Sequence, residues 1–162
     1  GYLNPIMKFG FEAFCQKCVE CGIDGVIIPD LPFKDYEETY KPIADRYDIR
    51  VIMLITPETS EARVREIDEH TDGFIYMVSS AATTGAQKDF DSQKQAYFKK
   101  IQDMHLRNPR MVGFGISNKQ TFDAACANSS GAIIGSRFVT LLNEAEGDAE
   151  KAITQLKEGL KK

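Results

Sequence analysis

Two glycines in the second half of the chain stand where backbone amides could bind an anion. Gly115 closes the apolar segment MVGFG, and Gly135 closes GAIIG twenty residues later, with Ser136 directly behind it. Glycine has no Cβ, so the backbone can approach a ligand closely. Amides at the start of a helix carry partial positive charge and hold anions without lysine or arginine. The pattern therefore predicts a phosphate site at these residues, with Gly85 as a fourth contributor, unless the glycines serve only tight turns.

The elements that would position these residues alternate regularly along the chain. Apolar runs lie at 25–30, 51–56, 73–78, 111–116 and 131–136. Amphipathic stretches lie at 9–21, 35–47, 59–70, 90–106 and 118–128. The runs are apolar on both faces, which is typical of parallel strands buried between helices. The sequence therefore predicts the α/β class, built from βα units.

Two helices, rather than one, are predicted after the last apolar run. They cover 137–145 and 149–162, with Gly147 and Asp148 between them. An extra short helix near the last strand is a feature of phosphate-binding (β/α)₈ barrels. Helix starts are predicted at Asp35, three residues before Glu38, and at Ser117, which would form a capping box with Gln120.

Cys15, Cys18 and Cys21 have the C-x-x-C spacing of metal ligands. The segment FEAFCQKCVECG also has a helical period, so the cysteines are predicted to pack as small apolar residues rather than to bind metal. No metal site is assigned. Free thiols indicate a reducing compartment, and the cytoplasm is the expected location.

The bulk composition fits one domain over all 162 residues. The formal net charge of −4 and the lack of a lysine- or arginine-rich run argue against nucleic acid as a partner. No apolar run approaches the roughly 20 residues of a membrane helix, so no membrane contact is expected.

Several motifs resemble the alpha subunit of tryptophan synthase. They are YLNP (2–5), GIDGVIIPDLPFKDYEE (22–38), TPETSEARV (56–64), GFIYMVSSAATTGA (73–86), VGFGIS (112–117) and GAIIGSRFV (131–139). They follow the family's order and spacing. The resemblance implies a TIM barrel that residues 1–162 cover from the end of strand three to the C-terminus. About five of eight strands are then present, which gives an incomplete barrel or an open sheet.

The family cleaves indole-3-glycerol phosphate to indole and glyceraldehyde 3-phosphate, a step of tryptophan biosynthesis. The resemblance implies a heterotetramer with a beta subunit that carries pyridoxal phosphate, and no cofactor in this chain. It also implies that the substrate contacts are Gly85, Gly115, Gly135, Ser136, Tyr76, Phe114, Thr84 and Tyr2.

Individual roles follow from the same resemblance. Tyr76 and Phe114 would line the substrate pocket, or else pack in the core. Thr84 would lie in the loop that closes over the substrate, or be an ordinary loop residue. Asp30 would couple closure of this loop to the beta subunit, or would simply form the turn before Pro32. Tyr2 would lie near the indole ring.

The chain departs from the family in two respects. Ala82 and Thr83 replace a glycine and a valine in the closing loop, which puts its closure in doubt. The family's catalytic glutamate and aspartate have no counterpart, so no catalytic residue is assigned and the chain by itself is expected to be inactive. Strands at 25–29 and 131–135 would become edges, and exposed edges favour self-association.

Two rival functions remain open from the sequence. One is another phosphate-binding barrel lyase or isomerase. The other is a non-catalytic fragment that binds phosphate esters or docks the beta subunit.

Overall fold

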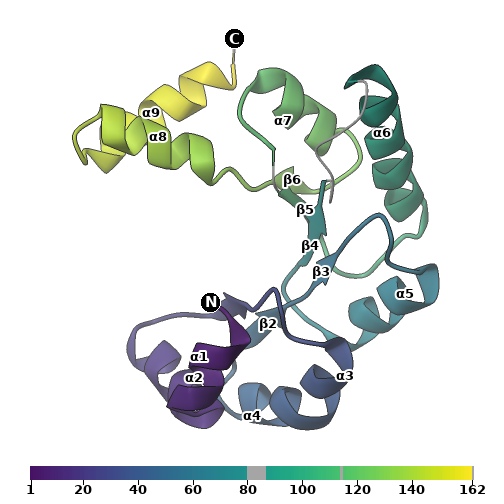
Figure 1. The fold of residues 1–162 in the computed structure, drawn as a ribbon, viewed down its shortest axis with the longest axis vertical. Coiled ribbons are helices and arrows are strands. Elements are labelled where there is room, and N and C mark those ends of the chain that lie inside the picture. Colours follow the sequence, from purple (N-terminus) through teal and green to yellow (C-terminus); the bar gives the residue numbers. More distant parts are fainter. Residues whose placement is uncertain (80–86, 114, 162) are drawn as a thin grey trace. The chain divides into compact units, whose positions relative to one another are not determined.

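The computed structural model describes residues 1–79, 87–113 and 115–161, and the chain forms two compact units (Figure 1). Unit 1 comprises Gly1–Tyr76 and Leu106–Pro109, and unit 2 comprises Met77–His105 and Arg110–Lys162. The boundary falls inside strand β4 (Ile75–Val78) and not in a linker. One domain over residues 1–162 therefore stays a prediction.

Unit 1 contains the first helices and strands. They are α1 (Leu3–Phe9), α2 (Phe11–Glu20), β1 (Gly25–Ile27), α3 (Phe33–Asp35), the π-helical turn η1 (Tyr36–Tyr40), α4 (Lys41–Arg46), β2 (Arg50–Ile52), β3 (Leu54–Ile55) and α5 (Glu61–His70). Strands β1 and β2 pair in parallel, with Val26 opposite Val51. Met53 separates β2 from β3, and its carbonyl accepts the Tyr76 amide of β4 at 2.9 Å.

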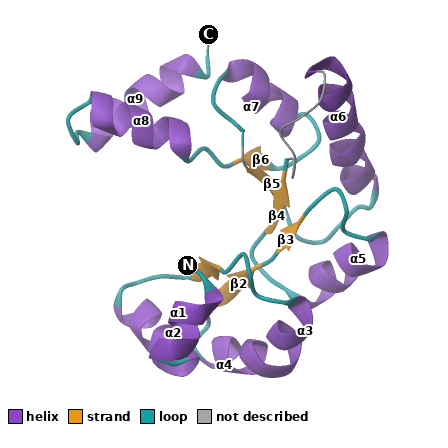
Figure 2. Ribbon diagram, in the orientation of Figure 1, coloured by secondary structure: helices purple, strands orange, loops and turns teal. Residues whose placement is uncertain are grey.

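Unit 2 contains the remaining elements. They are α6 (Gln87–Asp103), β5 (Arg110–Gly113), α7 (Lys119–Cys126), β6 (Gly131–Ala132), α8 (Ser136–Glu144) and α9 (Ala149–Gly159). Strands β5 and β6 are parallel. Helices α8 and α9 pack against each other as a hairpin (Figure 2). Leu141, Ala145 and Ala152 form the buried cluster of this hairpin. The prediction of two helices after the last strand is confirmed.

The α/β prediction is also confirmed. Each of the five apolar runs contains strand, with β2 and β3 sharing the run at 51–56. Strand side chains such as Ile55, Ile75 and Met77 are fully buried, as expected for strands that helices cover. The pairs β1–β2 and β5–β6 are parallel, which is the arrangement of βα units in a barrel.

Two of the three cysteines, Cys15 and Cys18, pack as predicted, whereas the prediction is wrong for Cys21. Cys15 and Cys18 are buried, whereas Cys21 lies exposed at the end of the helix. Burial raises the pKa of the Cys15 thiol to about 11 and also raises the pKa of Cys18. Both thiols therefore stay protonated near neutral pH and behave as small apolar side chains.

Two predicted helix starts are wrong in detail, and one helix was not predicted. The stretch at 9–21 contains α2, as predicted, but α1 precedes it and ends at Phe9, where Gly10 with φ 97° separates the two helices. Helix α7 is capped by Asn118 and not by Ser117. Asp35 caps nothing, because the helical segment begins earlier, at Phe33 after Pro32.

No helix in the described parts of the chain is long and apolar enough to cross a membrane.

Candidate functional site

The carboxyl ends of β5 and β6 lie side by side in unit 2. Val112 stands opposite Ala132, and the Ile133 amide donates to the Val112 carbonyl at 2.8 Å. Met111 and Val112 thus stand opposite the residues twenty positions later. Gly115 and Gly135 have the same offset in the sequence and follow the carboxyl ends of β5 and β6. The twenty-residue repeat noted in the sequence is therefore a register match between neighbouring strands.

Gly115 turns the chain away from β5. Its φ of 72° lies in the left-handed region, which side chains with a Cβ rarely adopt. A Cβ at this position would lie 3.8 Å from the Ser79 hydroxyl, in ordinary contact. Backbone conformation, not lack of space, therefore requires glycine here.

Gly135 and Ser136 begin helix α8. Gly135 is the N-cap with φ −101°, and no atom lies within 4 Å of the position where its Cβ would be. Its carbonyl accepts the Val139 amide at 3.1 Å, which starts the helix. No side chain in the described part of the chain caps this helix, and the first amides of a helix carry partial positive charge. Both residues are exposed.

The backbone amides of Gly115, Gly135 and Ser136 are the candidate donors to an anion. Within the described residues, no carbonyl or side chain accepts a hydrogen bond from the backbone nitrogens of Gly115, Gly135 or Ser136. The cation next to Ser136 along the chain is Arg137, which forms an exposed ion pair with Glu144 at 3.9 Å. Main-chain N–H groups and the α8 dipole can hold an anion here without a lysine or arginine.

Ser79 is a residue at this edge that sequence reasoning missed. Its amide donates to the Gly113 carbonyl at 3.1 Å, which places the end of β4 beside the end of β5. Its side chain is buried and points toward Gly115 closely enough to contact an added Cβ. The only signal in the sequence was a serine directly after the apolar run at 73–78.

Tyr76 lies in unit 1 on β4. It is 8% exposed, and burial raises its pKa above the usual value of a phenol. This burial fits the alternative that Tyr76 packs in the core. A pocket-lining role stays a prediction, and Phe114 lies outside the described residues.

Tyr2 and Asp30 lie near each other at the start of α1. Tyr2 is the N-cap and is 68% exposed. The Asp30 carboxylate accepts a hydrogen bond from the Leu3 amide at 2.9 Å and so caps the start of α1. The side chain of Tyr2, the N-cap residue, forms no capping hydrogen bond. This contact gives Asp30 a structural partner that neither sequence alternative included.

The remaining predicted positions, Thr84 and Gly85 together with Ala82 and Thr83, lie outside the described residues.

Comparison with known proteins decides the family. The family model described as tryptophan synthase alpha chain matches residues 1–162. The chain is 80% identical over 157 residues to the tryptophan synthase alpha chain of Bacteroides fragilis.

The chain belongs to the tryptophan synthase alpha chain family.

Solved structures of this family have the same fold. The tryptophan synthase A-subunit of Pyrococcus furiosus matches with a TM-score of 0.81 at 27% identity, covering 98% of this chain and 63% of that chain. The tryptophan synthase complex of the same organism matches with a TM-score of 0.80 at 26% identity, again covering 98% and 63%. The fold is therefore that of a truncated tryptophan synthase alpha barrel.

The chain spans about three-fifths of the length of its curated relatives. The match to Bacteroides fragilis covers 97% of this chain but 59% of that protein. The βα units described above thus correspond to part of a longer barrel in the relatives.

Proposed function

We propose that this chain supplies the phosphate-binding part of a lyase that cleaves indole-3-glycerol phosphate to indole and glyceraldehyde 3-phosphate. The parallel register of β5 and β6 carries the proposal, because their carboxyl ends lead to Gly115 and to the start of α8 at Gly135 and Ser136. A phosphate dianion would be held by these amides and by Ser136 at the start of α8. Gly85 is expected to contribute a further contact.

The arrangement would bind one end of the substrate and leave the chemistry to other residues. Cleavage of the carbon–carbon bond needs an acid and a base to move protons at the ring carbon and at the glycerol hydroxyl. The carboxylates that perform these steps in the family have no counterpart in residues 1–162. We therefore expect the chain by itself to release no indole, with or without an added beta subunit.

The partner of the intact protein is proposed to be a tryptophan synthase beta subunit, in a heterotetramer. Support comes from the similarity to the tryptophan synthase complex of Pyrococcus furiosus. Pyridoxal phosphate would then belong to the partner, and Thr84 and Asp30 would couple loop closure to it. The buried, reduced thiols of α2 support a cytoplasmic location.

Titration of the ¹⁵N-labelled chain with glycerol 3-phosphate tests the phosphate site. We expect saturable changes in the NMR chemical shifts of the Gly115, Gly135 and Ser136 amides. Glycerol, which lacks the phosphate, should cause no saturable change at these amides. Shifts scattered over the surface, or none at Gly135 and Ser136, would overturn the proposal.

Gly135→Ala adds a steric test of the same site. The added methyl meets no protein atom within 4 Å, so the free energy of unfolding should change little. It would, however, occupy the space into which the phosphate must come, and we expect affinity to fall at least about tenfold, which corresponds to about 1.4 kcal/mol. Gly159→Ala, in α9, is the matched control and should leave binding unchanged.

A further inference from the structure

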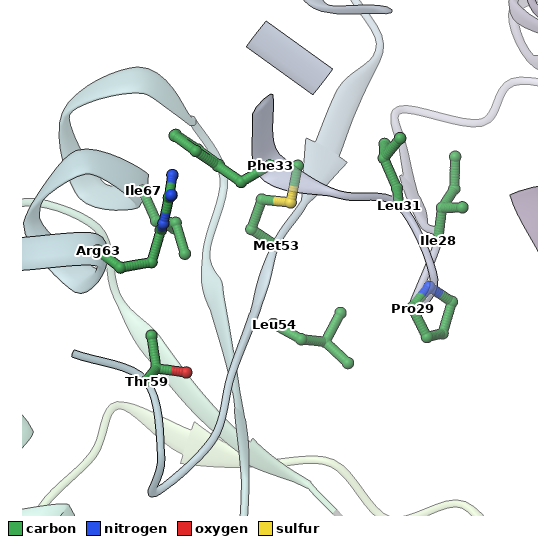
Figure 3. A pocket seen from close by; sticks show the side chains of 9 residues that line it. All are labelled: Ile28, Pro29, Leu31, Phe33, Met53, Leu54, Thr59, Arg63 and Ile67. Carbon is green, nitrogen blue, oxygen red and sulfur yellow. The ribbon is translucent and has the colours of Figure 1, made fainter. Parts of the chain in front are cut away.

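Unit 1 contains a cavity of about 240 Å³ that the proposed phosphate site does not use. It lies between the loop after β1, the segment Met53–Leu54 and helix α5 (Figure 3). Nine residues line it, namely Ile28, Pro29, Leu31, Phe33, Met53, Leu54, Thr59, Arg63 and Ile67. Seven of these side chains are apolar, and only Thr59 and Arg63 are polar. Pockets for small molecules typically combine apolar walls with a few polar groups that fix orientation.

The walls of the cavity come from three separate segments. Figure 3 shows Arg63 and Ile67 on one side, on α5, and Leu31 and Ile28 on the opposite side. Met53 lies between the two sides. The side chains of Ile28, Met53 and Ile67 are each at most 4% exposed, so these walls belong to the packed core of unit 1.

Arg63 is the single charged residue of the lining. Its guanidinium carbon lies 4.9 Å from the centroid of the Phe33 ring, which fixes the side chain by a cation–π contact. It also pairs with Glu66 at 3.0 Å, but both side chains are about half exposed, at 45% and 52%. Exposed pairs of this kind are weak, so a ligand carboxylate can replace Glu66 without large loss.

The size of the cavity limits the ligand to about one ring. A dry apolar cavity of about 150 Å³ already accommodates benzene, and this one adds room for a small polar group. The Phe33 ring at the wall favours an aromatic partner in an offset or tilted arrangement. Arg63 favours a carboxylate, which its planar guanidinium can bind through two hydrogen bonds.

From these observations we infer that the cavity is a binding site for a small aromatic monocarboxylate. Its ring would lie against Met53, Leu54 and Ile67, and its carboxylate would bind Arg63. All of its residues belong to unit 1, whereas Gly115, Gly135 and Ser136 belong to unit 2.

Benzoate and benzamide are a matched pair of probes, since they share shape and ring and differ in charge. The chain is labelled with ¹³C at its methionine methyl groups and titrated with each probe. We expect the Met53 methyl signal to shift saturably with benzoate, while Met7, exposed on α1, stays in place. Benzamide should bind at least about fivefold more weakly, because it cannot form the charge-assisted contact.

Substitution of the arginine tests its role directly. Arg63→Met keeps an apolar side chain and removes the charge, so benzoate affinity should fall at least about fivefold while benzamide affinity changes little. Arg65→Met, on the exposed part of the same helix, is the matched control and should leave both affinities unchanged. No shift of Met53 with benzoate, or equal binding of benzoate to Arg63→Met and to the unaltered chain, would overturn the inference.

Discussion

Gly115 and Gly135 serve the proposed phosphate site for different physical reasons. Gly115 has φ 72° and needs glycine for its conformation. Gly135 has φ −101°, which other residues adopt without strain. Glycine at 135 therefore provides open space at the start of α8 rather than a special backbone angle, which is what an approaching ligand requires.

Gly115→Ala should destabilise the chain through the backbone alone. A residue with a Cβ in the left-handed region costs roughly 1–2 kcal/mol, and the contact with Ser79 at 3.8 Å adds no clash. Urea unfolding should show a loss of about that size. Gly159→Ala at the end of α9 should be neutral or slightly stabilising, because alanine has the higher helix propensity. An unchanged midpoint for Gly115→Ala would mean that the left-handed conformation is not kept in solution.

At the scale of the elements, α7 shows how a helix start depends on local geometry. Ser117 and Gln120 have the spacing of a capping box, and so do Asn118 and Thr121. In the structure the Thr121 amide donates to the Asn118 side chain at 2.9 Å, and the Asn118 amide donates to the Thr121 hydroxyl at 3.2 Å. The later pair therefore forms the cap.

Asn118→Ala should cost about 1 kcal/mol of stability, since it removes the side chain that accepts the Thr121 amide. Ser117→Ala is the matched control and should cost much less, because only the Ser117 backbone amide takes part in the cap, donating to Thr121 at 3.1 Å. Unfolding of both variants by denaturant measures the difference. Equal losses would contradict the assignment of the cap to Asn118.

Helix α2 links stability to pH through Cys15. Burial, more than the nearby charges, raises the pKa of this thiol from 9.0 to about 11. The folded state thus keeps the proton that the unfolded chain releases above pH 9. The protonated Cys15 thiol therefore contributes its full share of the free energy of unfolding below pH 9, and this contribution is lost as pH rises toward 11.

Unfolding free energies at pH 8 and pH 10.5 test this linkage. The unaltered chain should lose stability between the two values, and Cys15→Ala should lose less. Cys21→Ala is the control, because Cys21 is exposed on the same helix and should keep the full pH dependence. If Cys15→Ala keeps the full dependence as well, the buried thiol is not its cause.

At the scale of the whole molecule, the chain covers only part of the barrel formed by its relatives. Large apolar side chains lie exposed in unit 1, with Met7 53% and Phe9 58% accessible on α1. The Gly1 ammonium group donates to the Ile27 carbonyl at 3.0 Å, so the start of α1 lies beside strand β1. An apolar surface next to a strand edge favours association with another chain.

We therefore expect the isolated chain to self-associate. Size-exclusion chromatography with light scattering should give a mass above 18.1 kDa that rises with protein concentration. The double variant Met7→Lys, Phe9→Lys should lower the associated fraction, whereas Ile153→Lys, on α9 in unit 2, should not. A monomer at every concentration would exclude association through strand edges or through α1.

The alternation of strands and helices could be predicted from the sequence because burial imposes a pattern on local composition. Runs such as GVIIPD and VIMLIT are apolar on both faces, and helices such as α2 repeat apolar residues at three and four positions. Helix starts were harder to predict from the sequence. Asn118 and Ser117 are both suitable N-cap residues, and only the backbone conformation decides which of them caps α7. The end of α1 at Gly10 was hard to predict for a similar reason. Glycine permits the positive φ found there but does not require it.

The sequence by itself determined the family, the α/β class and the glycines of the proposed phosphate site, because these depend on residue type and on order along the chain. Only the tertiary structure decided that Asp30 caps α1, that Ser79 lies beside Gly115, and that Arg63 and Phe33 line a cavity with Met53. Each of these contacts joins residues at least ten positions apart. Such contacts depend on how strands and helices pack, and no local pattern of residues specifies that packing.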